Sequence, residues 1–320
     1  MYTTAFNLRH VRCLILLIAT LAPAAMARAE GQPPASAESM GASSGAGGGE
    51  QAALNAAIAA MVRGPAEVKL LDQATLRLPP GYGFIPSEQA ANLLRSMGNV
   101  IGSAPLGMVV STDGGSGWFV VAQFEKSGYI KDDDAKDWDA GKLLQNLKDG
   151  TEQANAERTS RGIPEMEVLG WVEAPHYDVS AHQLVWSASL QQKRAAENAD
   201  KGINYNTYAL GRDGYISMNL VTDLKSIEAQ KPIARTLLSG LEFGGGKRYA
   251  DFNSSTDTVA AYGLAALVGG IAAKKLGLIA VIVAFFLKFI KVFALAGIAL
   301  VAGWGKWWKG RRDKNNNAQV

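Results

Sequence analysis

The chain has 320 residues, of which 48% are hydrophobic, and its formal net charge of +3 hides a marked asymmetry. Residues 30–257 carry 20 basic and 28 acidic residues, whereas residues 258–320 carry nine basic and one acidic residue. The acidic main part argues against nucleic acid as a partner, because nucleic-acid binding needs basic patches that neutralise phosphates.

Residues 1–29 have the pattern of a secretory signal peptide. Arg9 and Arg12 make a positive start, residues 13–22 form an apolar core, and residues 25–29 offer small side chains at cleavage positions. An uncleaved anchor is the alternative, and export follows in both cases. Cys13 is the only cysteine, so a processed chain would have no disulfide, thiolate nucleophile or cysteine-bound metal.

Residues 30–49 are rich in Ala, Ser, Gly and Pro, a composition that cannot bury a core and predicts a flexible, disordered tether. Apolar residues at helical spacing then predict a helix over 51–63, which Gly64 and Pro65 end.

The pattern over residues 50–250 predicts an α+β domain. Hairpins across turn signals such as residues 112–117 and 211–214 outnumber strand–helix–strand crossovers, which favours an antiparallel hairpin-built sheet with packed helices. We expect strands at 74–78, 108–111, 118–124, 166–172, 183–190, 204–210, 215–221 and 241–243, and helices at 88–97, 135–161 and 226–239.

Residues 258–304 contain no Asp or Glu and predict a transmembrane anchor, because about 20 apolar residues span a bilayer as a helix. The lysines at 274 and 275 divide the stretch, so both a two-helix hairpin and a single crossing fit it, and those at 288 and 291 interrupt its second part. Small residues at 263, 266, 269 and 270 would allow close helix–helix approach. The tail 305–320 is basic, which favours the cytoplasm. A buried hydrophobic hairpin of a soluble protein is the alternative.

Several short motifs together resemble one family. They are Gly64-Pro65, Leu78-Pro79-Pro80-Gly81-Tyr82, Trp118-Phe119-Val120-Val121, Gly128-Tyr129-Ile130, Asp132-Asp133-Asp134-Ala135, Ala154-Asn155-x-x-Arg158, Gly170-Trp171, Pro175-x-Tyr177-Asp178 and His182-x-Leu184-x-Trp186. The chain is similar in these to the bacterial membrane-anchored proteins classed as domain of unknown function 2167, from about residue 52 through the anchor. The resemblance implies an envelope protein with a signal sequence and a C-terminal anchor, and it implies no activity. The order of elements also resembles sandwiches of the photosystem-accessory or Mog1 kind.

His176 and His182 flank one predicted turn together with Tyr177 and Asp178. Such a group is a candidate ligand-binding, metal or acid–base site, although histidines at loops and strand edges are commoner.

The acidic run that begins at Asp132 is the other polar candidate. Carboxylates could bind a hard cation, but the EF-hand pattern is absent and a solvated helix start is the expected role. Trp118, Trp138, Trp171 and Trp186 are expected to be core rather than a binding surface.

We therefore expect a bacterial inner-membrane protein with a periplasmic main domain. Its partners would be the lipid bilayer and a membrane or periplasmic protein, and it would act as a non-enzymatic interaction or accessory module without cofactor or metal. The alternative is a periplasmic ligand-binding or hydrolytic domain that uses residues 176–182.

Overall fold

The computed structural model describes residues 46–99, 101–113, 117–160, 162–196 and 201–269. The expected signal peptide, most of the tether, the apolar run from 270 onward and the basic tail lie outside these residues. Among the described residues, no helix has the length and the apolar character needed to cross a membrane.

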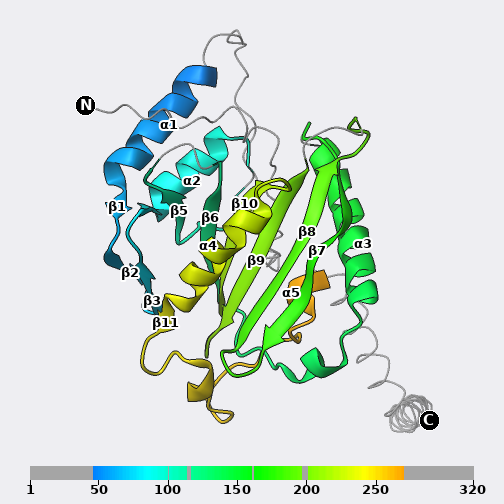
Figure 1. The fold of residues 1–320 in the computed structure, drawn as a ribbon. Coiled ribbons are helices and arrows are strands. Elements are labelled where there is room, and N and C mark those ends of the chain that lie inside the picture. Colours follow the sequence, from blue (N-terminus) through cyan, green and yellow to red (C-terminus); the bar gives the residue numbers. More distant parts are fainter. Residues whose placement is uncertain (1–45, 100, 114–116, 161, 197–200, 270–320) are drawn as a thin grey trace, which may run out of the picture. The chain divides into compact units, whose positions relative to one another are not determined.

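The centre of the domain is an eight-stranded sheet in which all neighbouring strands are antiparallel (Figure 1). A second, three-stranded antiparallel sheet has the order β11-β3-β2. The large sheet has the order β1 (Val62–Arg63), β4 (Tyr82–Pro86), β5 (Gly107–Ser111), β6 (Phe119–Glu125), β10 (Tyr215–Asp223), β9 (Gly202–Leu210), β8 (Gln183–Gln192) and β7 (Met166–Asp178), and the small sheet contains β11 (Leu241–Phe243), β3 (Ala74–Leu78) and β2 (Ala66–Leu70).

Alternation of side chains along the central strands explains why both faces of the large sheet are covered. In β10, Ile216, Met218 and Leu220 point to one face, and Tyr215 and Val221 point to the other. Since alternate residues of a strand face opposite sides, apolar residues at both parities require a packed layer on each side. The α+β class and the hairpin-built antiparallel sheet are thereby confirmed.

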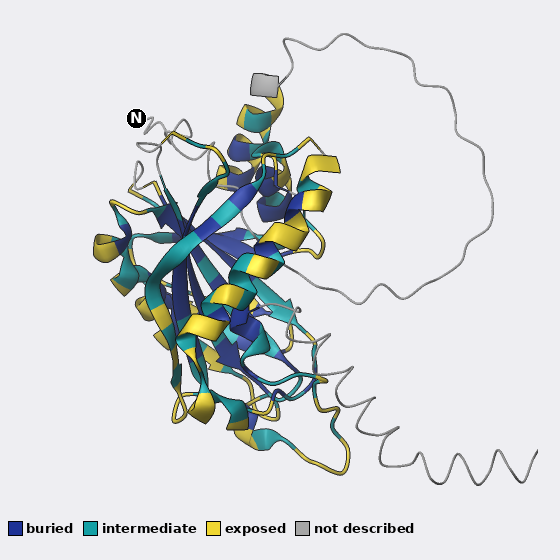
Figure 2. Ribbon diagram, turned by 90° about the vertical axis from the view of Figure 1, so that its right-hand side faces the viewer, coloured by how far each residue is buried: buried dark blue, intermediate teal, exposed yellow. Residues whose placement is uncertain are grey.

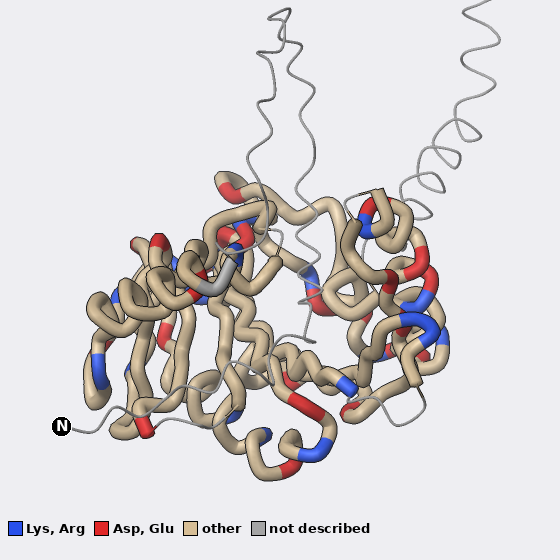
Figure 3. Tube along the Cα trace, turned by 90° about the horizontal axis from the view of Figure 1, so that it is seen from above, with Lys and Arg blue, Asp and Glu red and all other residues tan. Residues whose placement is uncertain are grey.

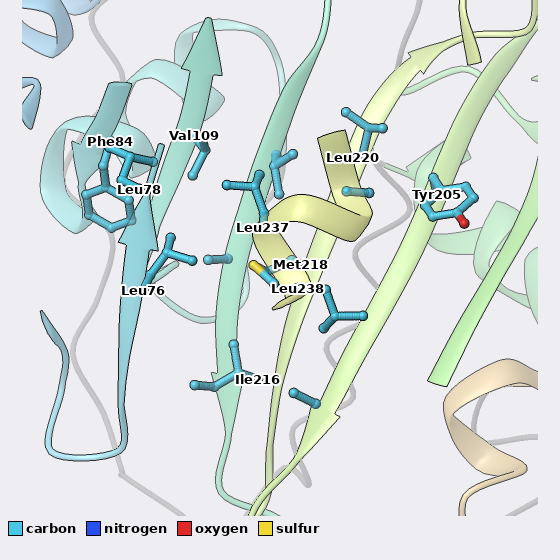
Figure 4. Close-up of a cluster of buried hydrophobic side chains, with 14 of the residues drawn as sticks. Leu76, Leu78, Phe84, Val109, Tyr205, Ile216, Met218, Leu220, Leu237 and Leu238 are labelled. Carbon is cyan, nitrogen blue, oxygen red and sulfur yellow. The ribbon is translucent and has the colours of Figure 1, made fainter. Parts of the chain in front are cut away.

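One face is covered by α4 (Ile227–Ser239) and the small sheet. Leu237 and Leu238 of α4 meet Leu76 of β3 and Met218 of β10 in one buried cluster (Figure 4). Figure 1 shows α4 running across this face of the sheet.

The other face carries two separate clusters. Helices α1 (Ala46–Ala60) and α2 (Ser87–Ser96) cover β4, β5 and β6, while α3 (Ala140–Ser160) and the short α5 (Ala266–Gly269) cover β7 and β8. In Figure 2 the strands are dark blue between helices whose outer surfaces are yellow, so the sheet is the buried middle layer.

Several elements differ from the sequence expectation, and strands β2 and β4 were not expected at all. Helix α1 begins at Ala46, inside the predicted tether, and ends at Ala60, so that Val62 and Arg63 form β1 instead of a last helical turn. Helix α3 begins at Ala140, because residues 133–137 form a separate 3-10 turn. Strand β7 extends to Asp178, because register shifts let one strand pass through a stretch that reads as a turn.

Residues 258–269, expected to open the membrane anchor, pack into the domain instead. Leu264 is fully buried, and Leu267 and Val268 are also buried in the cluster under α3. Gly263 lies against the Asp134 carboxylate, where a Cβ atom would come within 2.4 Å of Oδ2. Gly263 and Gly269 therefore pack closely within the domain, and residues 258–269 do not form the continuous helix expected of a membrane anchor.

Candidate functional site

The residues singled out at 176–182 lie at one end of the β7–β8 hairpin. His176, Tyr177 and Asp178 are the last residues of β7, opposite Val185, Leu184 and Gln183 of β8. The loop predicted at 174–178 is thus a strand, and the turn comprises residues 179–182, with His182 at a φ of 51°. Alternation along β7 sends Tyr177 toward the cluster under α3 and leaves His176 exposed.

Tyr177 and His182 meet a third residue, Asp132, which comes from the segment before α3. The Tyr177 hydroxyl donates to Oδ2 of Asp132 at 2.7 Å and lies 3.2 Å from Nδ1 of His182. Nδ1 is 3.8 Å from the same carboxylate oxygen. We name Asp132, Tyr177 and His182 the Tyr177 cluster.

The protons available in the Tyr177 cluster determine which group donates each hydrogen bond. A phenol has one proton to donate, and here it goes to the carboxylate. The contact with His182 then needs a proton on Nδ1. Burial raises the pKa of Tyr177 strongly, and the hydrogen bond to Asp132 and the charge of Asp132 raise it further. The phenol is therefore a permanent donor rather than a base.

An aromatic stack lies beside the Tyr177 cluster. The His182 ring is 4.1 Å from Tyr249 between centroids, Tyr249 stacks on Tyr129 at 4.3 Å, and Tyr129 stacks on Phe252 at 3.9 Å. The Tyr249 hydroxyl is buried and donates to the Ile130 carbonyl oxygen at 2.7 Å. The imidazole is thus held by its Nδ1 edge and by one ring face.

Asp178 stabilises the turn at residues 179–182 and does not join the Tyr177 cluster. Its Oδ1 accepts hydrogen bonds from the Ser180 backbone N–H at 2.8 Å, the Ser180 hydroxyl at 2.6 Å and the Ala181 N–H at 3.1 Å. These bonds lower the pKa of Asp178, with the Ser180 hydroxyl contributing most. Within the described residues, no hydrogen bond or ring contact joins His176 to Tyr177 or His182, so the expected group of four is not brought together.

The acidic run is used for capping. Both oxygens of Asp134 accept backbone N–H groups, those of Leu264 at 3.1 Å and Ala265 at 3.0 Å. Asp139 accepts the N–H groups of Gly141 and Lys142 at the start of α3. Carboxylates at a helix start satisfy orphan N–H donors and complement the helix dipole. Across the described ranges, no group of three His, Cys, Asp or Glu residues has the arrangement of a metal site.

Two of the four tryptophans outside the apolar C-terminal run are core residues, as predicted. Trp118 and Trp186 are buried, one on each face of the sheet. Trp171 is half-buried, stacks edge-on against Trp186 with centroids 5.8 Å apart, and donates its N–H to the Ala140 carbonyl at 3.0 Å. Trp138 is also half-buried in the cluster under α3.

The residues around the Tyr177 cluster hold the C-terminal segment, residues 249–269. The Tyr129 N–H donates to the Thr258 carbonyl, and the Tyr129 carbonyl accepts the Ala260 N–H, both at 2.8 Å. Gly128 has a φ of 84°, and a Cβ atom there would come within 2.6 Å of the Thr258 oxygen, so the close approach depends on glycine.

An ion pair strengthens this attachment. Arg212, in the β9–β10 turn, donates from Nε and Nη2 to the two oxygens of Asp257 at 2.6 and 2.7 Å. The Arg212 side chain and backbone N–H contacts lower the pKa of Asp257 well below its usual range. Figure 3 shows positive and negative residues interspersed along the described turns and helices.

The sequence pattern does not predict that Asp132, Tyr129 and Tyr249 lie beside His182. Asp132 and Tyr129 belong to motifs that carry the family resemblance, which is the signal that could have indicated them. Tyr249 follows a glycine-rich stretch that is typical of a linker, so it carries no such signal.

The fold and the arrangement of these residues define an α+β domain with an eight-stranded antiparallel sheet, in which Tyr129, Asp134 and Arg212 bind the C-terminal segment of the same domain. Residues 62–299 match the family described as protein of unknown function (DUF2167), and the chain belongs to this family. No curated protein matches the sequence. Among solved structures, cyanobacterial PsbP (CyanoP) from Synechocystis sp. PCC 6803 is similar at 11% identity and a TM-score of 0.32, over 57% of this chain and 91% of that chain.

Proposed function

We propose that this protein is a membrane-anchored component of the bacterial envelope, held in the inner membrane with its main domain in the periplasm. There it serves as a non-enzymatic interaction or accessory module of a membrane complex. The signal-peptide pattern of residues 1–29 and the acid-free apolar composition of residues 270–304 support the location.

The main support for this proposal is that residues of the family motifs contact the C-terminal segment, residues 249–269. Tyr129 and Asp134 bond to the backbone of residues 258–265, and Tyr249 stacks against His182. The polar atoms of these residues therefore bind the segment that precedes the apolar run in the sequence. Such a role suits a module that presents a rigid surface near a membrane.

Crosslinking in whole cells followed by purification in mild detergent tests this function. We expect the full-length protein to carry a partner in a fixed ratio, and a variant with a stop codon after Gly269 to lose it or to retain it only weakly. A full-length protein that purifies as a clean monomer after crosslinking would contradict the proposal.

A second function is supported by the partial exposure of the Tyr177 cluster. The side chains of His182 and Asp132 are 30% and 24% exposed, so a small ligand could reach the imidazole edge. In this alternative the domain binds or hydrolyses a periplasmic ligand at residues 176–182. Replacement of His182 by Gln keeps a hydrogen-bonding side chain; a wild-type phenotype for H182Q and H176A in a strain sensitive to loss of the gene would end this alternative.

A further inference from the structure

We propose that a group of polar side chains in the middle of the large sheet binds a neutral, hydroxyl-rich small molecule of the saccharide class. The group consists of Asn206 and Tyr208 of β9, Ser217 and Asn219 of β10, and Gln123 of β6, and we name it the polar strip. It is separate from the residues of the Tyr177 cluster, and its ligand goes beyond the proposed function.

Strand register places the polar strip on one face of the sheet. Asn206 is directly opposite Asn219, and Ser217 is directly opposite both Tyr208 and Gln123 on its two neighbouring strands. Residues that are directly opposite in an antiparallel ladder share a face. The alternate residues of these strands belong to the cluster on the α4 side, so the polar strip faces the other side.

The polar strip separates the two apolar clusters of that face. The cluster under α1 and α2 reaches Val121, opposite Asn219, and the cluster under α3 reaches Trp186, opposite Asn206. Among the described elements, α1 and α2 pack mainly on β4 and β5, and α3 packs mainly on β7. The helix that packs on β9 and β10 is α4, on the opposite face. The polar strip therefore lies between the two groups of helices.

Two buried polar atoms at the polar strip have no hydrogen-bond partner among the described residues. They are the indole N–H of Trp186 and Oδ1 of Asn219. The Trp186 side chain belongs to a residue that is only 8% exposed, and the nearby Tyr208 hydroxyl does not reach hydrogen-bond geometry with its N–H. Buried polar groups in native proteins are normally paired, because an unpaired one is destabilising. A bound molecule would supply the missing partners.

The two unpaired atoms call for a ligand that carries hydroxyl groups. An indole N–H only donates, and a carboxamide oxygen only accepts. A hydroxyl donates and accepts through one oxygen, so a molecule with several hydroxyls satisfies both atoms, whichever way the Asn219 amide is turned. None of the five side chains of the polar strip is charged, which disfavours an ion because a buried charge without a counter-charge is costly.

The surroundings of the polar strip favour a small molecule over a peptide. Strands β9 and β10 are inner strands, each hydrogen-bonded to a neighbour on both sides, so a peptide cannot add to them as a further strand. Tyr208 and Tyr215 stand edge to face with ring centroids 5.6 Å apart beside the polar strip. Aromatic walls with a few fixed polar groups are typical of small-molecule sites. Ser217 and Asn219 keep partial exposure, which gives a ligand access.

Saccharide binding to the full-length protein tests this inference, in a detergent without a sugar head group. The probes are glucose, N-acetylglucosamine and maltose, and binding is measured by isothermal titration calorimetry. Asn219→Leu removes the carboxamide and keeps a similar side-chain volume. The matched control is Thr207→Val, because Thr207 is a buried residue of β9 on the opposite face, where its hydroxyl donates to the Met218 carbonyl at 2.9 Å.

We expect at least one probe to bind the parent with a millimolar or lower Kd. N219L should bind that probe at least tenfold more weakly, which corresponds to about 1.4 kcal/mol, and T207V should bind it like the parent. Without sugar, the Tm of N219L should not be lower than that of the parent, because the substitution removes an unpaired buried atom. This measurement separates loss of binding from loss of folding.

Two results would overturn the inference. If none of the three probes binds the parent, the unpaired atoms are satisfied by water only. If N219L binds a probe as tightly as the parent does, the saccharide binds elsewhere. Both results leave the proposed function in place, because that function is tested by crosslinking to a partner.

Discussion

Leu264 distinguishes a folded C-terminal segment from a membrane-embedded one. Replacing this fully buried leucine by alanine removes side-chain atoms that pack against Ile130 and Leu143. Buried Leu→Ala substitutions cost about 2–5 kcal/mol, and we take about 3 kcal/mol because the site lies in a small cluster near the end of the folded chain. For a domain of about 200 residues, each kcal/mol lowers Tm by about 2–4 °C, so L264A should lower Tm by about 6–12 °C.

The assay is thermal unfolding of full-length protein in mild detergent, followed by near-UV circular dichroism. The matched control is Leu224→Ala, because Leu224 is 40% exposed and its truncation should cost less than about 0.5 kcal/mol. If Leu264 lay in the micelle instead of the domain, both variants would unfold at the temperature of the parent. Equal Tm values for L264A and L224A would therefore refute the packing argument.

Three further substitutions test other contacts. Asn155→Ala should destabilise the domain by about 1–3 kcal/mol in urea unfolding, because the buried Asn155 amide bonds both the N–H and the carbonyl of Met166; an unchanged midpoint would contradict this. Asp257→Asn tests the pH dependence of stability. Because the pKa of Asp257 is lowered in the folded protein, its stabilising effect is complete above about pH 4 and is lost as the pH falls further. The parent should therefore lose more stability than D257N between about pH 5 and 2, and parallel curves of Tm against pH would disprove the role of Arg212. Tyr177→Phe should cost about 1–2 kcal/mol and weaken protection of the β7–β8 turn from hydrogen exchange, and full protection would show that the Tyr177 hydroxyl orders nothing.

Local signals in the sequence were sufficient for most of the sheet. The hairpins β5–β6 and β9–β10 follow from alternating apolar residues around glycine-rich turns, and β3 was placed at its exact residues. Gly98 ends α2 with a φ of 84°, as a C-terminal glycine should. These elements depend on neighbours in the chain, which is why pattern alone could predict them.

The site depends on contacts between distant residues, and pattern alone could not predict it. Tyr177 and Asp132 are 45 residues apart, and Leu264 and Asp134 are 130 apart. Residues 258–269 have a composition that predicts burial in lipid, because burial in a core and burial in a bilayer select the same residue types. What distinguishes them is the hydrogen-bonding partner of the backbone, and this is a property of the tertiary structure.

Strand β7 lies at the edge of the large sheet and is 13 residues long, which gives neighbouring molecules a template for strand pairing. The three register shifts along β7 interrupt its straight run of backbone groups, and Glu173 and His176 flank the last of them. The irregular strand thus limits pairing of this edge with a second molecule while Tyr177 still reaches Asp132.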